Sequence, residues 1–578
     1  MQKIFTVKIA GMAGQGIKSA GIMYARFANR SGLHIYNYIE YPSIIRGGHN
    51  VMQINISNEE VTGPSNKTDF LVALNQESID VHADELTEGA GVVFDGEDNL
   101  DVSKLPKGVH LCPVPLSLLA KKAGGGELLV NTVALGALTA HLGGDLEILK
   151  NLVKDEYEDK GEEVVAADHK AAELGYEFAS ENYPNVKNDT LKPVETTSLT
   201  KPRMVINGNE AAALGAIAGG VQFAAIYPMS PISNILHVLA KHQETYGYVY
   251  KQPEDEISAI NMVMGASFAG ARSFTATSGG GFALMSEGYG MAGIAELPVV
   301  IVEGMRGGPA TGIPTWSSQG DLRFVLHAHQ DDFPRIILTP GDPEETFYMT
   351  AQAMNLAEKY QTPVVVLIDK NVCENDKSVD YLDLSKFELD RGKFTMEKVE
   401  NFERYNLSPD GISQRSIPGV GNFFIANSDE HDPVGYSSEE IDNRNVQMHK
   451  RMTKLETCAK EDMPEPELFG PEDADITLIS WGSNKGVLQH AVKEFDNVNF
   501  LHLTWVNPFP VEKVTKVLEN AKHPILFECN YTSQMGGIIR EKTGIEIKDK
   551  HLKFDGRPIY IEEVREKINS VLKKGAKA

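Results

Sequence analysis

The chain has 578 residues, 42% of them hydrophobic, and a scale of about 150 residues per domain predicts roughly four domains with sizeable cores. Its 80 acidic and 55 basic residues give a net charge of −25, which argues against nucleic acid or an anionic membrane surface as the main partner. No apolar run is long enough to span a membrane, and the four cysteines are widely spaced, so we expect a protein of a reducing, cytoplasmic compartment.

The first residues predict an α/β domain. A strand at residues 3–10 runs into a glycine loop, and a helix is expected to begin near Ile17. Gly11, Gly14 and Gly16 do not follow the Rossmann spacing, and Lys18 comes one residue too late after Gly16 for a Walker loop. Two interpretations stay open, a tight turn that packs the helix on the sheet and an anion site at the helix N-terminus.

A linker is predicted at residues 186–202, because this stretch is polar and has no apolar period. The next region, residues 203–373, alternates apolar bursts such as 299–302 and 363–368 with helices. This pattern is typical of buried parallel strands in an α/β domain.

The pattern loosens in a connecting region at residues 374–471, where a charged helix is expected at 437–456. Glu430, His431 and Asp432 are adjacent in this region, which disfavours a shared metal ion, so we interpret them as a surface turn. A last α/β unit is predicted at 472–578.

The residues most informative about chemistry form three short motifs in the region 203–373. They are the turn Tyr227-Pro228-Met229-Ser230-Pro231, the acid Glu256 at the start of an apolar helix, and the loop Thr277-Ser278-Gly279-Gly280-Gly281. Together they have the composition of a site for a heteroaromatic cofactor. The pattern alone favours a plainer interpretation of Glu256, a charge that stabilises the N-terminus of a buried helix. The alternative is that Glu256 points into a cleft and bonds a ring nitrogen.

The segment from about 202 to 371 resembles the alpha subunit of the 2-oxoacid:ferredoxin oxidoreductases, thiamin diphosphate enzymes that oxidatively decarboxylate 2-oxoacids. Four motifs occur in the family's order, and together they make a chance match unlikely. They are the turn at 227–231, the acidic helix start at 254–257, the loop at 275–279, and the stretch from Arg306 to Thr315 with Gln319 and Asp321.

The resemblance implies a role for several residues. Glu256 matches the glutamate that pairs with the aminopyrimidine of the cofactor, Ser230 stands where the family has threonine, and Arg306 matches an arginine that holds the substrate carboxylate. A salt bridge from Arg306 to Glu303 is the alternative. The cofactor-binding residues implied by the resemblance are Tyr227, Pro228, Met229, Glu256, Ser278 and Gly279.

Departures and absences qualify the match. Gly280 replaces a proline and Ala310 a serine of the family pattern, which leaves the pocket but puts substrate preference in doubt. The sequence has no Gly-Asp-Gly motif for a magnesium diphosphate site and no cysteine spacing for a cluster. We therefore expect this chain to bind only the pyrimidine end of the cofactor and to contribute no metal ligand. The resemblance implies a beta subunit with the magnesium site and a [4Fe–4S] cluster, an (alpha-beta)2 heterotetramer, ferredoxin as acceptor, and an inactive isolated chain.

The flanking regions carry related resemblances. Residues 1–185 resemble the gamma subunit of the same oxidoreductases, and the resemblance makes Gly14, Gln15, Gly16, Lys18 and Arg46 candidates for contacting coenzyme A. The last unit resembles a transketolase C-terminal domain, with Glu528, Asn530 and Gln534 among its matching residues.

The sequence thus predicts a multidomain α/β protein with a gamma-type domain, a thiamin pyrimidine-binding domain and a transketolase C-terminal-like domain. Its expected activity is the oxidation of a 2-oxoacid, with 2-oxoglutarate or a broad range favoured, using coenzyme A to give an acyl-CoA, carbon dioxide and reduced ferredoxin. Two alternatives stay open: a non-redox thiamin lyase or transketolase-type subunit, and a non-catalytic ligand-binding or assembly subunit.

Overall fold

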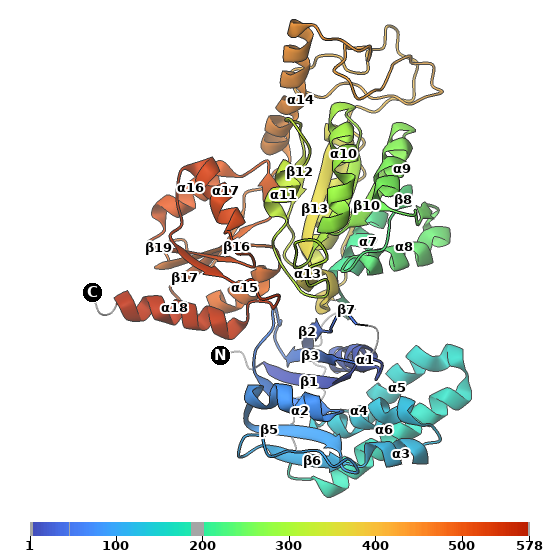
Figure 1. The fold of residues 1–578 in the computed structure, drawn as a ribbon, viewed down its shortest axis with the longest axis vertical. Coiled ribbons are helices and arrows are strands. Elements are labelled where there is room, and N and C mark those ends of the chain that lie inside the picture. Colours follow the sequence, from blue (N-terminus) through green and yellow to red (C-terminus); the bar gives the residue numbers. More distant parts are fainter. Residues whose placement is uncertain (1–3, 45–46, 187–201, 576–578) are drawn as a thin grey trace. The chain divides into compact units, whose positions relative to one another are not determined.

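The structure is a computed structural model that describes residues 4–44, 47–186 and 202–575. Arg46 and most of the predicted linker lie outside the described residues. The chain forms two compact units, and each combines segments that are distant in the sequence (Figure 1). The first unit holds Met1–Ile206, Asn375–Tyr381 and Ile559–Ala578, and the second holds Asn207–Glu374 and Leu382–Pro558. The predicted multidomain α/β class is confirmed, while the predicted domain borders stay predictions.

An eight-stranded mixed sheet is the centre of the first unit, with strand order β6-β5-β4-β1-β3-β2-β14-β7. β1 pairs in parallel with β4 and antiparallel with β3. The strands are β1 (Phe5–Met12), β2 (His34–Glu40), β3 (His49–Ser57), β4 (Thr68–Ala73), β5 (Leu86–Asp95), β6 (His110–Val114), β7 (Arg203–Ile206) and β14 (Lys377–Asp380). The helices are α1 (Ile17–Arg30), α2 (Gln76–His82), α3 (Leu116–Lys122), α4 (Val130–His141), α5 (Leu146–Tyr157), α6 (Glu162–Asn182) and α18 (Ile561–Gly575).

Polar contacts attach the distant segments to the first unit. Asn37 Nδ2 donates to Asp376 Oδ2 at 2.9 Å, beside the short strand β14. Ser65 Oγ donates to Glu562 Oε1 at 2.8 Å, in the first turn of α18. The last helix of the chain is therefore part of the first unit.

The second unit contains a seven-stranded sheet, with strand order β18-β12-β13-β11-β10-β8-β9. The central strands β10, β11 and β13 are parallel, as the apolar bursts predicted. Its strands are β8 (Phe223–Ala225), β9 (Val249–Lys251), β10 (Ser273–Thr277), β11 (Val299–Met305), β12 (Ile336–Leu338), β13 (Pro363–Asp369) and β18 (Trp505–Asn507). The helices that follow or precede them are α7 (Gly208–Ala218), α8 (Ser233–Tyr246), α9 (Glu256–Phe268), α10 (Gly279–Ile294), α11 (Leu322–His327), α12 (Pro343–Tyr360) and α13 (Lys370–Glu374).

A five-stranded sheet completes the second unit, with strand order β15-β17-β16-β19-β20. Its strands are β15 (Glu467–Phe469), β16 (Ile476–Trp481), β17 (Val498–Leu503), β19 (His523–Glu528) and β20 (Asp549–Leu552), and its helices are α15 (Lys485–Glu494), α16 (Val511–Asn520) and α17 (Gln534–Thr543). The chain between β17 and α16 enters the neighbouring sheet as β18, which pairs antiparallel with β12. The two sheets of this unit are therefore joined by backbone hydrogen bonds.

Two apolar cores cover the faces of the seven-stranded sheet. Ile301 and Met305 of β11 belong to one core, which also includes Trp481 of the five-stranded sheet, and Val300 and Val302 belong to the other. Because side chains alternate along a strand, Glu303 lies on the face of Ile301 and Met305. The strand thus places an acid in an otherwise apolar layer.

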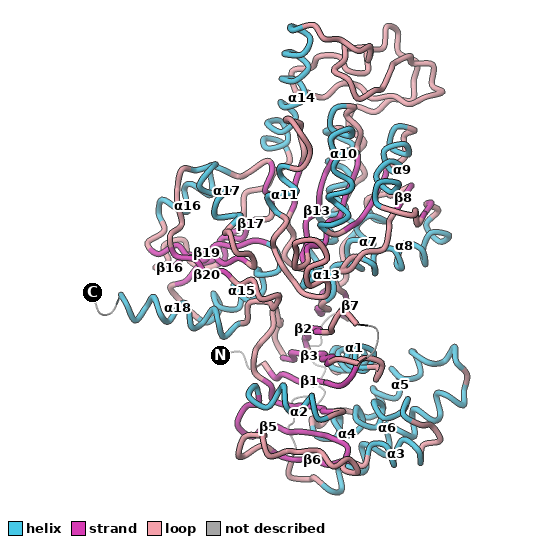
Figure 2. Tube along the Cα trace, in the orientation of Figure 1, coloured by secondary structure: helices cyan, strands magenta, loops and turns pink. Residues whose placement is uncertain are grey.

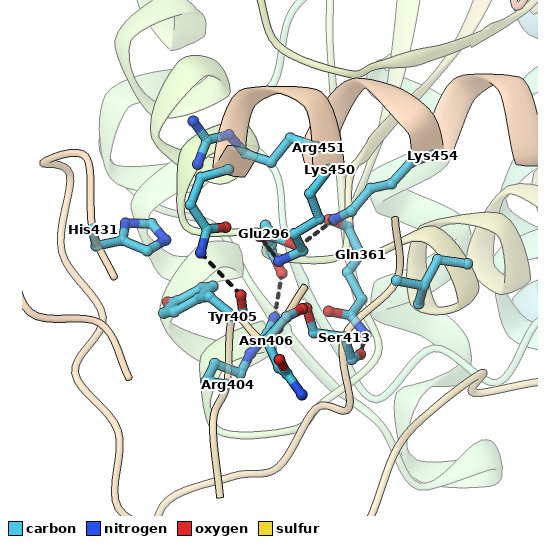
Figure 3. A network of polar contacts seen from close by, with 12 residues as sticks. Glu296, Gln361, Arg404, Tyr405, Asn406, Ser413, His431, Lys450, Arg451 and Lys454 are labelled. Atoms are coloured by element: carbon cyan, nitrogen blue, oxygen red, sulfur yellow. Dashed lines mark hydrogen bonds and ion pairs between the residues drawn. The ribbon is translucent and has the colours of Figure 1, made fainter. Parts of the chain in front are cut away.

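The connecting region is mostly loop and ends in α14 (Ile441–Glu461), as Figure 2 shows. It is attached to the neighbouring α/β layer by buried ion pairs, in which Lys450 and Lys454 of α14 reach Glu296 at 2.6 and 2.5 Å (Figure 3). Asp432 does form a turn, since its Oδ1 accepts the backbone N–H of Gly435 at 2.8 Å. The surface interpretation is wrong for His431, which is fully buried against Tyr405.

No helix among the described residues is both long and apolar enough to cross a membrane.

Candidate functional site

The predicted site motifs follow neighbouring strands at one edge of the seven-stranded sheet. The turn with Ser230 follows β8, the glycine loop follows β10, and Arg306 follows β11. The three strands are parallel, so their carboxyl ends meet at the same edge. In open α/β sheets this edge is where ligands bind.

Glu256 is the first residue of α9 and is 3% exposed. The preceding Asp255 caps the helix, because its side chain accepts the backbone N–H of Ser258 at 2.7 Å. Glu256 Oε1 is buried and has no hydrogen-bond partner. A buried carboxylate oxygen without a donor is costly, so the plainer interpretation of Glu256 as a helix-stabilising charge does not account for it. The capping role belongs to Asp255.

The first turn of α10 leaves room for the Glu256 carboxyl group. A methyl group at Gly281 would lie 2.6 Å from Glu256 Oε1 and 2.0 Å from Thr277 Oγ1. Such separations are shorter than any van der Waals contact, so only glycine allows this approach. The glycine loop therefore has a definite function here: it lets the acid reach the start of α10.

The prediction that the Glu256 helix is buried rather than amphipathic is wrong for one of its faces. Ile257 and Met262 of α9 are 49% and 43% exposed, and Leu284 of α10 is 50% exposed. Helices α9 and α10 pack on each other, and both leave apolar side chains uncovered. An apolar composition predicts burial, but it does not tell which face another polypeptide or solvent covers.

Ser230 is held from two sides by residues of other elements. Arg306 Nη1 donates to the Ser230 carbonyl at 2.8 Å, and Asn209 Nδ2 of α7 donates to the Pro231 carbonyl at 2.8 Å. Tyr227 and Met229 are half-buried and Pro228 is exposed in the same turn. The structure thus brings Ser230 and Arg306 together. Sequence reasoning missed Asn209, whose only signal is a carboxamide in the first turn of an alanine-rich helix.

The alternative partner of Arg306, Glu303, makes no ion pair with it among the described residues. Glu303 is fully buried, and neither of its carboxyl oxygens has a hydrogen-bond partner in the described part of the chain. Burial, together with the nearby Asp321 charge, raises the pKa of Glu303 well above its usual range, and burial also raises the pKa of Asp321. Burial lowers the pKa of Arg306, but a guanidinium remains charged at neutral pH.

The glycine loop adds a second buried polar group that lacks a hydrogen-bond partner. The Ser278 hydroxyl is buried and has no hydrogen-bond partner, and a methyl group at Gly279 would lie 2.4 Å from Asp321 Oδ2. Gly280 is exposed, and a methyl group there would meet nothing within 4 Å. The start of α10 thus touches Glu256 through Gly281 and Asp321 through Gly279.

The residues present fit the pyrimidine end of thiamin diphosphate. An aminopyrimidine offers ring nitrogens and an amino group, which match a buried carboxylate oxygen and a buried hydroxyl that lack partners. Glu256 and Ser278 supply these two groups, and of the three glycines beside them only Gly280 has open space where a side chain would stand. No group of three or more metal-ligating side chains occurs in the part of the chain that the structure describes.

The glycine loop of the first unit is a separate feature. Gln15 Oε1 accepts the backbone N–H of Met12 at 2.6 Å, and the Ala13 N–H donates to the Gly48 carbonyl at 3.1 Å. Gly16 precedes α1 in the left-handed region, with no side-chain cap, and Lys18 is exposed. The tight-turn interpretation is confirmed by these contacts, and the anion interpretation stays a prediction.

Two family models match the chain. Residues 214–450 match the thiamin diphosphate-binding domain of pyruvate flavodoxin/ferredoxin oxidoreductases, and residues 6–178 match a second domain of pyruvate ferredoxin/flavodoxin oxidoreductases. Together the two models cover the glycine loops of both units and the motifs with Glu256 and Arg306.

Similar proteins are known over the full length. The 2-oxoacid:ferredoxin oxidoreductase subunit alpha of Sulfolobus sp is 33% identical over 98% of this chain and 97% of that protein. The 2-oxoglutarate oxidoreductase subunit KorA of Mycobacterium tuberculosis is 27% identical over 98% of this chain and 91% of that protein. The structure of 2-oxoglutarate:ferredoxin oxidoreductase from Magnetococcus marinus, with 2-oxoglutarate, coenzyme A and succinyl-CoA bound, superposes with a TM-score of 0.91 and 32% identity. It covers 99% of this chain and 100% of that one.

Proposed function

The chain belongs to the alpha subunits of the 2-oxoacid:ferredoxin oxidoreductases, and we propose that its substrate is 2-oxoglutarate, which it oxidises with coenzyme A to succinyl-CoA and carbon dioxide. The observation that carries the proposal is the buried, unpartnered Oε1 of Glu256 against the glycine-rich start of α10. This is a thiamin-type site in an enzyme subunit, and family membership favours it over a non-redox lyase or a non-catalytic subunit.

Glu256 is the proposed acid–base residue of the site. Its carboxyl group bonds the pyrimidine ring and exchanges a proton with it. Carboxyl groups held within hydrogen-bond reach commonly serve as general acids and bases. Tyr227, Pro228, Met229, Ser278 and Gly279 line the space for the ring. Thiamin diphosphate, when bound, supplies the carbon nucleophile and the electron sink for decarboxylation.

Arg306 is the proposed ligand of the substrate carboxylate, with Ser230 beside it. The bond from Nη1 to the Ser230 carbonyl at 2.8 Å fixes one edge of the guanidinium and leaves other N–H groups for a carboxylate. Ser230 contributes a hydroxyl to the same place. Arg306 and Ser230 orient the 2-oxoacid, and Glu256 accepts and returns the proton.

Partner subunits follow from the alpha-subunit family. We propose that a beta subunit holds the magnesium, the diphosphate and a [4Fe–4S] cluster, passes electrons to ferredoxin, and assembles with this chain as an (alpha-beta)2 heterotetramer. The sequence supports this division, because it has no Gly-Asp-Gly motif and no cluster spacing of its cysteines. All four cysteines are buried as free thiols.

The M. marinus enzyme and the M. tuberculosis subunit are both named for 2-oxoglutarate, which supports this substrate. Coenzyme A is bound in the M. marinus structure. We place its contact in this chain at the loop Gly14–Lys18 and at Arg46 of the first unit. An unchanged Michaelis constant for coenzyme A after Arg46→Ala would remove Arg46 from that site.

The test is an assay of the chain co-purified with its beta subunit. The complex is given a panel of 2-oxoacids with coenzyme A, and reduction of ferredoxin or a viologen dye is followed. We expect the highest kcat/KM with 2-oxoglutarate and no turnover by the isolated chain. A preference for pyruvate or a branched oxoacid would refute the substrate, and turnover without the partner would refute the division of the site.

A further inference from the structure

The loop that follows Arg306 has an exposed tip and a packed return limb. Residues 308–313 at the tip are exposed, whereas residues 315–319 of the return limb are buried or half-buried. The loop closes at its base, where the Gly307 N–H donates to the Trp316 carbonyl at 3.1 Å. Because Gly307 is the next residue after Arg306, the position of Trp316 constrains the backbone from which the Arg306 side chain extends.

The contacts of the return limb come from the carboxyl ends of three strands. β16, β19 and β20 are parallel neighbours, so these ends lie at one edge of the five-stranded sheet. The Ser317 N–H donates to the carbonyl of Gly556, which follows β20, at 3.0 Å. Gln319 bonds Cys529, the residue after β19, through its own N–H and through Oε1, each at 2.8 Å. Its Nε2 donates to the carbonyl of Trp481, the last residue of β16, at 2.9 Å. In α/β sheets this edge is the usual place for a ligand, and here it binds the loop.

The turn after β20 is the part of this edge that contacts the Trp316 side chain. The guanidinium carbon of Arg557 lies 3.7 Å from the centroid of the Trp316 ring, a geometry in which the ring face attracts the cation. Asp555 orients Arg557, because its Oδ1 accepts the Arg557 backbone N–H at 2.9 Å and its carbonyl accepts from Nη1 at 3.0 Å. A methyl group at Gly556 would lie 2.8 Å from Ile313 Cδ1 and 2.9 Å from Trp316 Cβ. Only glycine therefore allows the turn to approach the loop so closely.

We propose that the carboxyl edge of the five-stranded sheet positions Arg306 for the carboxylate of the 2-oxoacid, through the turn at residues 555–557 and the side chain of Trp316. The inference rests on the proposed function of Arg306 and adds the residues that hold it in place. Arg557 contacts the Trp316 ring, and the Trp316 carbonyl accepts from Gly307, which is bonded to Arg306. These residues act through others and are positioning residues. Their loss should raise the KM for the oxoacid and change kcat much less.

Gly556→Ala tests the position of the loop in the assembled complex. The added methyl group displaces Ile313 and Trp316, so we expect the KM for 2-oxoglutarate to rise about tenfold. Gly544→Ala is the matched control. Gly544 also has a positive φ, at the end of α17, but a methyl group there would meet nothing within 4 Å. The control carries the backbone strain without the clash and should leave KM unchanged. Equal KM values for the two variants would overturn the proposal.

Arg557→Ala and Trp316→Ala test the contact between the two side chains without a clash. Loss of the guanidinium should raise the KM for 2-oxoglutarate about two- to fivefold, which corresponds to one cation–π contact. Trp316→Phe keeps a ring face and should raise KM less than Trp316→Ala. In the Trp316→Ala background, Arg557→Ala should have no further effect, because the two groups form one contact. Arg540→Ala, at an exposed side chain of α17, is the control. Effects of Arg557→Ala and Trp316→Ala that add in full would contradict a shared role.

Tryptophan fluorescence separates this inference from the proposed function. Trp316 is half-buried, whereas Trp481 and Trp505, the other two tryptophans, are buried. Quenching of the full chain by acrylamide, without its partner, therefore reports mainly on Trp316, and Trp316→Phe should remove most of the quenchable emission. Arg557→Ala should raise the quenching constant, because the guanidinium no longer covers the ring. A constant equal to that of the wild type would count against the contact. A complex that turns over no 2-oxoacid would instead overturn the proposed function and leave the quenching result standing.

Discussion

The two ends of β11 place buried glutamates in opposite environments. Glu296, just before the strand, has one oxygen on Lys450 and the other on Lys454, and its carbonyl accepts from Arg404 at 2.8 Å (Figure 3). Glu303, near the end of the strand, is equally buried, but neither of its oxygens has a hydrogen-bond partner among the described residues. Across the first turn of α10, Glu256 Oε1 has no partner.

The difference separates a buried acid that stabilises the fold from buried acids that are available to a ligand. Burial opposes ionisation of Glu296, but Lys450, Lys454 and Arg404 outweigh it and hold the pKa of Glu296 below its usual range. Because both carboxyl oxygens of Glu296 are paired with lysines, this side chain is not available to bind a ligand. A buried carboxyl group that lacks hydrogen-bond partners marks a place where a cofactor or substrate supplies the missing partner.

The largest expected effect is at Glu256. Glu256→Gln removes the proposed acid–base group and should lower kcat of the assembled complex about 10²–10⁴-fold. Steady-state turnover of 2-oxoglutarate measures this. Glu254→Gln, at an exposed acid two residues earlier, should leave kcat unchanged. Near-normal turnover of the Glu256 variant would contradict the contrast between buried acids that have partners and buried acids that lack them.

The next effect is on stability. Glu296→Gln leaves two buried lysines without a counter-charge, so we expect the free energy of unfolding to fall by about 3–5 kcal/mol at pH 7. Because folding lowers the pKa of Glu296, its contribution is present above the unfolded pKa and is lost as pH falls through the folded pKa. Denaturant unfolding at pH 7 and at pH 4 measures this, and the difference should shrink at pH 4. Glu287→Gln, at an exposed residue of α10, is the control.

Arg306→Lys sharpens the assignment of the substrate site. Lysine keeps the charge but loses the planar fork that bonds Ser230 and a carboxylate together. We expect the KM for 2-oxoglutarate to rise about 10–100-fold, equivalent to roughly 1.4–2.8 kcal/mol. Arg540→Lys, at an exposed side chain, should not change KM. An unaltered KM in the Arg306 variant would assign the carboxylate to another cation.

The smallest effect concerns Asn209. Asn209→Ala removes the hydrogen bond to the Pro231 carbonyl and should raise the KM for the oxoacid only a few-fold, since one such bond contributes about 1 kcal/mol. Asn520→Ala, at an exposed position of α16, is the matched control. If KM stays constant while the Tm falls, Asn209 supports the fold and not the position of Ser230.

Much of the architecture was predictable because it depends on local pattern. The apolar bursts at 299–302 and 363–368 became β11 and β13, the helix expected near Ile17 is α1, and the charged helix is α14. The resemblance of four ordered motifs located the candidate site and its family. Sequence reasoning did not find the role of Asn209, because its partner, the Pro231 carbonyl, lies in another element of the chain.

The sequence by itself determined the strands, the helices and the types of side chain at the site, since apolar period and residue chemistry are local properties. Only the tertiary structure decided which buried carboxyl groups have ion-pair or hydrogen-bond partners. Glu296 and Glu303 are seven positions apart and equally buried, yet α14 brings two lysines to Glu296, while the oxygens of Glu303 have no hydrogen-bond partner in the described part of the chain. Partners that arrive from residues 450 and 454 cannot be read from the residues next to Glu296, because burial and bonding depend on which distant elements pack there.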